Sequence, residues 1–370
     1  MTVLICIPCL MTGGTEVQTL NLVQALIAGG HRVVTVCYFE NCEDMVSRFQ
    51  NAGCEVVCLS PDGIRIDGWR GILFLYKGLR SVLKQYKPDV AHVQYMAPGA
   101  IPILLLRLLG MRQILTTAHT AADIYPSLKL VHFIQRHCVR AFTCITELAE
   151  RSFFGSSQLY DENYPLKKRN HFTIYNALPT SLPIAQKRST VNCPMTIGVV
   201  SRLESIKGMD LVVPAFAKVK AAHPEVRLLV VGDGSLRRQM EQQVQAAGII
   251  DSVEFVGSQP QEVLAQYYDR IDILLMPSRS EGFGLTAIEG MARGCVVVAA
   301  RVGGLPEVVC DGEVGLLHRK EDAEDMAYKI GRLIGSHAEL NRIRANALLY
   351  VSRFSIERYL ALIVNLYSKL

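Results

Sequence analysis

Short apolar runs alternate with longer segments of helical periodicity along almost the whole chain. Such runs predict buried strands, and their alternation with helices predicts an α/β fold with doubly wound parallel sheets covered on both faces. In the first half, strands are expected at residues 3–7, 32–38, 56–58, 90–93, 114–117, 144–146 and 172–175. In the second half, they are expected at residues 195–200, 227–231, 253–256, 271–276, 295–299 and 315–317.

Between the two halves lies a segment, residues 178–194, with three prolines, small polar residues and no periodicity. This composition predicts a linker, so two Rossmann-like domains are expected at residues 1–185 and 190–354. The pattern of residues 355–370 predicts an amphipathic helix that packs against the first domain. Two such domains place a ligand cleft between them, at the carboxyl ends of both sheets.

The eleven cysteines do not form a disulfide framework, because their number is odd and they lie mostly in apolar runs, as reduced cytosolic thiols do. Cys6 and Cys9 have redox spacing, but no strand precedes them to complete a thioredoxin-like unit. They are interpreted as buried thiols near a loop. No second Cys or His pair stands at ligand spacing, so no metal site is predicted.

The amino terminus has no basic leader, and the longest apolar stretch, residues 100–109, is interrupted by Pro102 and Arg107. The sequence therefore predicts a cytoplasmic protein, or one bound peripherally to the inner face of the cytoplasmic membrane. The net charge of +5 is mild, and no block of Lys and Arg is interleaved with aromatic residues, which argues against nucleic acid as a partner.

The most informative stretch is residues 276–307, where Glu281 precedes a Gly-Phe-Gly turn and residues 285–292 predict a helix. A strand, a glycine-rich turn and a helix direct unpaired N–H groups at an anion. Glu289, inside that helix, does not suit the anion and suits a neutral hydroxylated group such as a ribose. The stretch therefore predicts a nucleotide-sugar site.

Two further features bear on an anion. Gly13-Gly14 stands between a strand and a helix, either as a close approach to a phosphate or sugar or as a plain tight turn, and Gly303-Gly304 repeats the arrangement. Arg202 and Lys207 follow a strand of the second half, as diphosphate ligands or as solvated loop charges.

Several nucleotide and metal motifs are missing. The turn at Gly232-Asp233-Gly234 lacks the third glycine of a dinucleotide fingerprint, and no Walker A sequence occurs. No Asp-x-Asp pair is present to hold a divalent metal. A leaving diphosphate would then be stabilised by Arg202, Lys207 and helix N-termini, without a metal or another cofactor.

Together these segments resemble the family 4 glycosyltransferases, retaining nucleotide-sugar-dependent enzymes with the GT-B fold. The segments that carry the resemblance are Gly13-Gly14, TTAHTAAD around His119, Ser201-Arg202-Leu203 with Lys207-Gly208, Gly232-Asp233-Gly234, Glu281-Gly-Phe-Gly-Leu through Glu289, and Gly303-Gly304-Leu-Pro-Glu307. The resemblance implies two Rossmann-like domains that face each other across a cleft, with the acceptor side in the first domain and the donor side in the second.

The resemblance also implies roles for individual residues. By this resemblance, Arg202 and Lys207 bind the pyrophosphate, and Glu289 binds the ribose hydroxyls. Glu281 and the amides of Phe283, Gly284 and Leu285 bind the donor sugar and phosphate, with Gly234 at the same site. Gly13 and Gly14 close over the diphosphate. His119 is expected to contact the transferred sugar, or else to be a satisfied strand-end histidine. The chain departs from the family at Ala177, where Asn-Gly is frequent, and at Thr120.

The implied reaction is a same-face substitution in which the departing phosphate oxygen takes the acceptor's proton, with Glu281 as a covalent nucleophile as the alternative. The acceptor is expected to be a saccharide, lipid-linked by analogy with the family. Residues 69–87 and 128–142 mix basic and large apolar residues, which would suit an anionic membrane surface. The alternative, which is favoured for any one helix, is that the apolar side of each helix is simply core and the charges opposite are solvated.

The sequence thus predicts a hexosyltransferase that uses a UDP- or GDP-sugar in cell-surface polysaccharide or glycolipid biosynthesis. Another GT-B enzyme, such as a sugar-nucleotide epimerase or a sugar-phosphate synthase, is the first alternative. A catalytically silent sugar-nucleotide-binding subunit is the second, and the intact Arg202, Lys207, Glu281 and Glu289 argue against it.

Overall fold

The computed structural model describes residues 1–94, 100–122, 125, 127–166, 168–186 and 191–370, which form two compact units. Unit 1 comprises Met1–Pro179 and Ile356–Leu370, and unit 2 comprises Thr180–Ser355. The division falls inside the segment 178–194, of which residues 187–190 lie outside the described residues. Unit 1 therefore ends before residue 185, and it includes the carboxyl-terminal segment of the chain.

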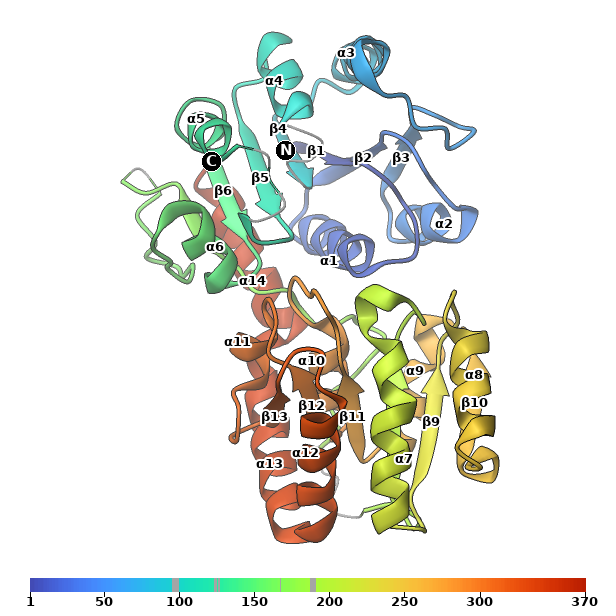
Figure 1. The fold of residues 1–370 in the computed structure, drawn as a ribbon. Helices are drawn as coiled ribbons and strands as arrows, with labels where there is room; N and C mark the ends of the chain where they lie inside the picture. The colour runs from blue at the N-terminus through green and yellow to red at the C-terminus, as the bar shows by residue number, and fades with distance from the viewer. Residues whose placement is uncertain (95–99, 123–124, 126, 167, 187–190) are drawn as a thin grey trace. The chain divides into compact units, whose positions relative to one another are not determined.

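Unit 1 is built on a seven-stranded parallel sheet with the strand order β3-β2-β1-β4-β5-β6-β7 (Figure 1). Its strands are β1 (Thr2–Ile7), β2 (Arg32–Cys37), β3 (Glu55–Cys58), β4 (Val90–Gln94), β5 (Ile114–Ala118), β6 (Ala141–Cys144) and β7 (His171–Thr173). Its helices are α1 (Gly14–Ala28), α2 (Glu43–Asn51), α3 (Gly68–Tyr86), α4 (Ile101–Leu108), α5 (Leu128–His137), α6 (Glu147–Phe154) and α14 (Ile356–Ser368).

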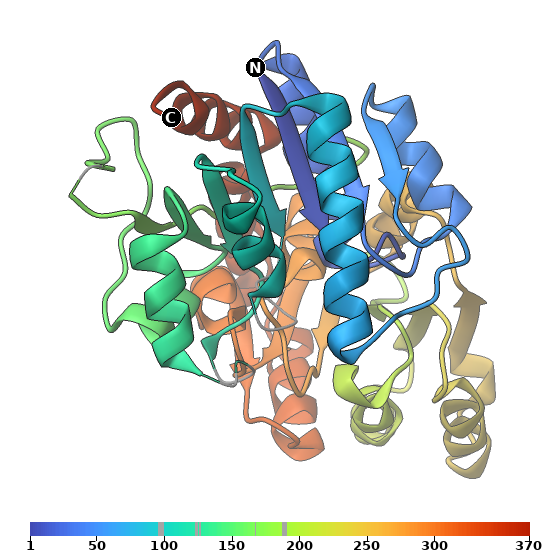
Figure 2. The same cartoon turned by 90° about the horizontal axis from the view of Figure 1, so that it is seen from above.

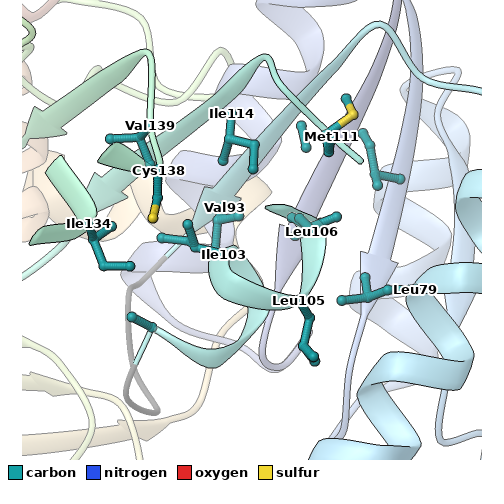
Figure 3. Packing of buried hydrophobic residues seen from close by; sticks show 14 of the residues in the cluster. Leu79, Val93, Ile103, Leu105, Leu106, Met111, Ile114, Ile134, Cys138 and Val139 are labelled. Carbon is teal, nitrogen blue, oxygen red and sulfur yellow. The ribbon is translucent and has the colours of Figure 1, made fainter. Parts of the chain in front are cut away.

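Both faces of this sheet are covered, as Figure 2 shows from a second direction. Along β1, Val3, Ile5 and Ile7 pack in a cluster with α1, α2 and α14, whereas Leu4 and Cys6 pack in a second cluster with α3, α4 and α5. Figure 3 shows the second cluster, in which side chains of α3, α4 and α5 meet those of the strands. Burial on both faces explains why the strands read as continuous apolar runs.

Unit 2 contains a six-stranded parallel sheet with the strand order β10-β9-β8-β11-β12-β13. Its strands are β8 (Thr196–Val200), β9 (Arg227–Val231), β10 (Val253–Gly257), β11 (Ile273–Met276), β12 (Val296–Ala300) and β13 (Gly315–His318). Its α-helices are α7 (Val212–Ala222), α8 (Arg237–Ala246), α9 (Leu264–Arg270), α10 (Leu285–Ala292), α11 (Leu305–Val309), α12 (Ala323–Gly335) and α13 (His337–Tyr350), and its short 3-10 helices include η2 (Ser205–Lys207), η3 (Met209–Leu211) and η6 (Val351–Phe354).

The two parallel, doubly wound sheets confirm the predicted fold class, and α10 covers the predicted residues 285–292. The prediction was wrong at the sixth strand, which ends at Cys144 and does not run from residue 144 to 146. Thr146 caps α6 instead, because its side chain accepts a hydrogen bond from the amide of Ala149 at 3.1 Å. The chain therefore leaves the strand before the β-branched residues Ile145 and Thr146.

The strand order reverses between β1 and β4 in unit 1, and between β8 and β11 in unit 2. In open α/β sheets ligands bind beyond the carboxyl ends of the strands at such switch points. In unit 2 the loop after β8 carries Arg202 and Lys207, and the loop after β11 carries Glu281. In unit 1 the loop after β1 carries Gly13. The predicted residues thus lie at the places where this topology accommodates a ligand.

All eleven cysteines are free, as predicted from their number and distribution. Burial raises the pKa of Cys6 to about 12 and that of Cys9 to about 12, so neither thiol is activated. Among the described residues, no helix is long and apolar enough to cross a membrane, and no group of His, Cys, Asp or Glu side chains is arranged to hold a metal ion.

Candidate active site

The loops after β8 and β11 meet in an ion pair between two of the predicted site residues. Lys207 Nζ lies 2.7 Å from Glu281 Oε2, and the side chains are 23% and 16% exposed. The Ser278 hydroxyl lies 3.5 Å from the same oxygen. Lys207 is therefore not a freely solvated loop charge: it is held beside Glu281 at the switch point of unit 2.

Glycines allow these loops to pack directly on one another. Gly208 has a φ of +66°, and a side chain there would overlap the carbonyl oxygen of Pro277 in the loop after β11. Gly303 has a φ of +51°, and a side chain there would overlap the carbonyl oxygen of Glu281. These two glycines allow close contact between neighbouring loops, and an approach of Gly303 to a ligand stays a prediction.

Arg279 fixes the turn that presents Lys207. Its guanidinium donates to both carboxylate oxygens of Asp210, at 2.7 and 2.8 Å, and its backbone amide donates to the Ile206 carbonyl at 2.9 Å. A bidentate Arg–carboxylate pair of this kind gives both orientation and strength. The residues on either side of Lys207 are therefore tied to the loop that carries Glu281.

The N-terminus of α10 carries the amides that were predicted to bind an anion. Gly284 is the N-cap residue, and no side chain caps the helix. The first N–H groups of a helix have no intrahelical partner, so those of Leu285 and its neighbours point beyond the helix end. The Phe283 ring is buried edge-to-face against Phe354 at 5.6 Å, which anchors the turn before α10.

Glu289 projects from α10 into a buried environment. Its Oε2 oxygen accepts a hydrogen bond from the Tyr268 hydroxyl at 2.7 Å. Burial raises the pKa of the Glu289 carboxyl above its usual value, whereas the Tyr268 hydrogen bond lowers it. This carboxyl is thus placed for short-range hydrogen bonding, as a ribose contact requires.

Arg202 and Gly234 flank this group of residues. The Arg202 side chain is exposed and forms no ion pair with any carboxylate in the described ranges, although hydrogen bonds from Ser235 and then the charge of Arg202 lower the pKa of Glu204. Gly234 follows β9, and a side chain there would lie 2.6 Å from the Leu203 carbonyl oxygen. Leu203 and Asp233 are also joined by a backbone hydrogen bond of 2.9 Å. Gly234 therefore keeps the loop after β9 against the loop that carries Arg202.

In unit 1, Gly13 is the N-cap residue of α1 in an extended conformation, and Gly14 begins the helix. The Glu16 side chain lies beside Gly13 and accepts a hydrogen bond from the Cys9 thiol at 3.2 Å. The structure places these glycines at the switch point of unit 1. Their contact with a donor diphosphate stays a prediction.

His119 directly follows β5 and is buried. Its Nε2 atom lies 2.9 Å from Gln94 Oε1, and both residues line a cavity of about 20 Å³ together with His92 and Thr117. Burial lowers the pKa of His119 to about 3, so the imidazole is neutral near neutral pH. His119 thus has a hydrogen-bond partner within the protein, as in the alternative of a strand-end histidine with a structural role. Its contact with a sugar stays a prediction.

The structure thus brings together in unit 2 the predicted residues Arg202, Lys207, Gly234, Glu281, Phe283, Gly284, Leu285 and Glu289, and it places Gly13, Gly14 and His119 in unit 1. Sequence reasoning missed the residues that support them, namely Arg279, Tyr268 and Gln94. A signal existed for Gln94, because His92 and Gln94 are polar at period two in an otherwise apolar strand.

Solved structures with this architecture cover the whole chain. HepE of Anabaena in complex with UDP and glucose matches with a TM-score of 0.79 and 19% identity over 100% of both chains. Sucrose-phosphate synthase of Thermosynechococcus elongatus matches with a TM-score of 0.78 and 22% identity over 100% of this chain and 98% of the other. The fold is therefore that of the GT-B glycosyltransferases.

Family comparisons cover most of the sequence. The description "Glycosyltransferase Family 4" matches residues 12–179, and "Glycosyl transferases group 1" matches residues 184–350. The chain belongs to the family 4 glycosyltransferases, as its motifs indicated, and it is a transferase of the glycosyl type.

Individual relatives share less than a third of their residues with the chain over long stretches. An uncharacterised glycosyltransferase of Methanocaldococcus jannaschii, MJ1178, is 29% identical over 307 residues, 82% of either chain. A D-inositol 3-phosphate glycosyltransferase of Stackebrandtia nassauensis is 29% identical over 294 residues, 72% of this chain and 65% of that one. One from Segniliparus rotundus is 37% identical over 165 residues, 44% of this chain and 37% of that one.

Proposed function

We propose that this protein is a retaining glycosyltransferase that moves a sugar from a nucleotide diphosphate sugar to a lipid-linked saccharide in cell-surface polysaccharide or glycolipid biosynthesis. The observation that carries the donor assignment is the group of residues beside the Lys207–Glu281 pair. Glu281 lies at the loop before α10, the helix N-terminus supplies amides, and Glu289 is buried further along the same helix. This order suits a sugar, a phosphate and a ribose in succession.

The charges around the donor phosphates support a reaction without a metal ion. Lys207 provides a point charge, Arg202 an exposed guanidinium, and α10 the partial positive charge of its N-terminus. Preorganised charges of this kind stabilise a leaving diphosphate directly. In the proposed step, the bond from the anomeric carbon to the phosphate oxygen breaks as the acceptor oxygen bonds to the same face, and the phosphate oxygen takes the acceptor's proton.

A thermal unfolding experiment tests the donor site. We expect one of UDP, GDP and ADP to raise the melting temperature of the wild type, with or without EDTA, and the Glu289→Ala variant to lose most of that stabilisation. A nucleotide at a hundredfold excess over its Kd stabilises the folded state by about 2.7 kcal/mol. HepE was solved with UDP, which makes UDP the first nucleotide to test. No response to any of the three would contradict the donor site.

The outer surfaces of α3, α4 and α5 support a lipid-linked acceptor. Large apolar side chains are exposed on and beside these helices: Ile64, Trp69, Ile72, Leu73, Leu104, Leu108, Leu128 and Phe133. Leu75, Leu79 and Val82 of α3 are buried, so one side of this helix belongs to the core, and the exposed apolar residues are additional to that side. None of the three helices contains an acidic residue.

The charge of this region is strongly one-sided. Residues 68–140 contain ten Lys and Arg residues against Asp89 and Asp123, a formal charge of +8 in a chain whose total is +5. Basic residues beside an anionic leaflet contribute about 1 kcal/mol each, and apolar side chains that enter the interface add to this. A membrane that holds the acceptor by its lipid is the partner that this chemistry fits.

Flotation with lipid vesicles tests this surface. We expect the protein to bind vesicles of phosphatidylcholine with phosphatidylglycerol and not vesicles of phosphatidylcholine alone, and to be released by salt. Leu108→Ser should weaken binding by about tenfold, because a leucine that enters the interface is worth roughly 1.5–3 kcal/mol. Leu349→Ser is a matched control in unit 2, since the two leucines are 74% and 76% exposed. Equal loss in both variants would contradict the assignment.

A further inference from the structure

The hydrogen bond between Tyr268 and Glu289 connects the proposed ribose contact to a residue that the donor site does not otherwise include. Tyr268 lies on α9, is completely buried, and donates to Glu289 Oε2 at 2.7 Å. Burial raises the pKa of Tyr268 well above its usual value, and the negative charge of Glu289 raises it further. The phenol therefore stays protonated and acts only as a donor toward the carboxylate.

The second carboxylate oxygen is left for another donor. Within the part of the chain that the structure describes, Glu289 Oε1 accepts no hydrogen bond, although the residue is only 7% exposed. A carboxylate oxygen without a protein donor is left to water or to a ligand. A ribose presents hydroxyl donors, so Oε1 is the atom that a bound nucleoside would engage.

Helix α9 is held firmly enough to fix the carboxylate. Asp269, the residue after Tyr268, accepts two hydrogen bonds from Arg293 at the end of α10, from Nε at 2.8 Å and from a terminal nitrogen at 2.7 Å. Arg293 also donates to the Pro183 carbonyl at 3.0 Å. Two neighbouring residues of α9 thus bind α10 at two points, and the distance between the Tyr268 hydroxyl and Glu289 is set by the scaffold.

We propose that Tyr268 is a positioning residue for the donor nucleotide: it holds Glu289 Oε2 so that Oε1 accepts a hydrogen bond from a ribose hydroxyl, and it thereby sets the preference of the site for ribose over deoxyribose. This role rests on the proposed function, because it requires a nucleotide at α10. A carboxylate held in one orientation loses little freedom on binding, whereas one released from Tyr268 must be ordered by the ligand.

Tyr268→Phe tests the role by titration calorimetry with UDP, GDP and ADP and with the 2′-deoxy and 3′-deoxy form of whichever nucleotide binds. We expect the variant to bind the ribonucleotide about tenfold more weakly and the deoxy form lacking the engaged hydroxyl almost unchanged, so that the ribose preference falls by the same factor. Tyr267→Phe removes the same hydroxyl from the neighbouring, half-buried residue, and it should alter neither value.

A double variant shows whether Tyr268 acts through Glu289. Glu289→Gln alone should abolish the ribose preference, and adding Tyr268→Phe should cause no further loss in it. If Tyr268→Phe weakens the ribonucleotide and its deoxy forms by the same factor, the tyrosine supports the fold only and the positioning role is overturned. If the wild type binds no nucleotide at all, the proposed function itself fails, and that result is distinct from an unchanged preference in a binding protein.

Discussion

Replacement of Lys207 by Ala is expected to lower kcat/KM for sugar transfer by about 10²–10³-fold, the effect of removing one preorganised charge from a developing anion. Lys207 is the cation that the structure holds beside Glu281 at 2.7 Å. Its loss removes charge from the proposed leaving diphosphate and leaves Glu281 without its partner. Initial rates of nucleoside diphosphate release, measured with a saccharide acceptor, give the comparison.

Two further variants separate this effect from a general loss of charge. Lys218→Ala removes a lysine whose exposed ion pair with Glu324 lies elsewhere in unit 2, and its activity should equal that of the wild type. Lys207→Arg keeps the charge in a different shape and should recover part of the activity. A loss below about tenfold in Lys207→Ala would contradict the role of this cation.

The second large effect concerns the stability of unit 2. Arg344 and Asp272 are 1% and 0% exposed and pair at 3.1 Å, and Asp272 also accepts from the amides of Thr196 and Asn192. Arg344→Met fills the space but leaves a buried carboxylate without its cation. We expect a loss of about 3–5 kcal/mol in the free energy of unfolding, measured by urea denaturation.

Arg342→Met is the matched control for this prediction. Arg342 lies on the same helix with a side chain that is 52% exposed; it meets Glu339 at 3.8 Å and donates to the Gly312 carbonyl at 3.1 Å. Its replacement should change the free energy of unfolding by less than about 1 kcal/mol. A similarly small change in Arg344→Met would show that the buried pair is not needed for the stability of unit 2.

The fold was largely predictable because burial on both faces of a parallel sheet leaves an apolar run for each strand. The runs at residues 3–7 and 227–231 mark β1 and β9 to within a residue. The error at β6 arose where strand-forming residues continue past the strand, in Cys144-Ile145-Thr146. There the strand ends because Thr146 caps the next helix, and the hydrophobicity of the residues alone does not predict such a cap.

The candidate site was predictable to the extent that its chemistry stands in the sequence itself. The order of Glu281, glycine turn and Glu289 indicated both an anion and a hydroxylated group. The purpose of the glycines was not predictable, because a missing side chain leaves space for a ligand or for another loop, and at Gly208 and Gly303 the space is filled by a loop. Tyr268 carried no signal, because a tyrosine on a short helix is usually core.

The sequence alone could not show whether the apolar residues of the segment 69–87 are exposed, as the predicted membrane contact requires. On a helix with residues such as Leu73, Leu75 and Lys77, periodicity predicts which residues share a face but not whether that face meets a core or a lipid. The structure buries Leu75 and exposes Leu73 and Trp69, the last by 70%. No short sequence motif identifies the acceptor, because many combinations of polar side chains can bind a sugar.

The most direct test of retaining transfer is the anomeric configuration of the product. The purified protein would be incubated in EDTA with UDP- and GDP-sugars and a lipid-linked saccharide fraction, and both the released nucleoside diphosphate and the new glycosidic bond would be followed by NMR. We expect release of one nucleoside diphosphate and a product bond with the configuration of the donor. An inverted bond, or a bound nucleotide sugar that is never consumed, would contradict it.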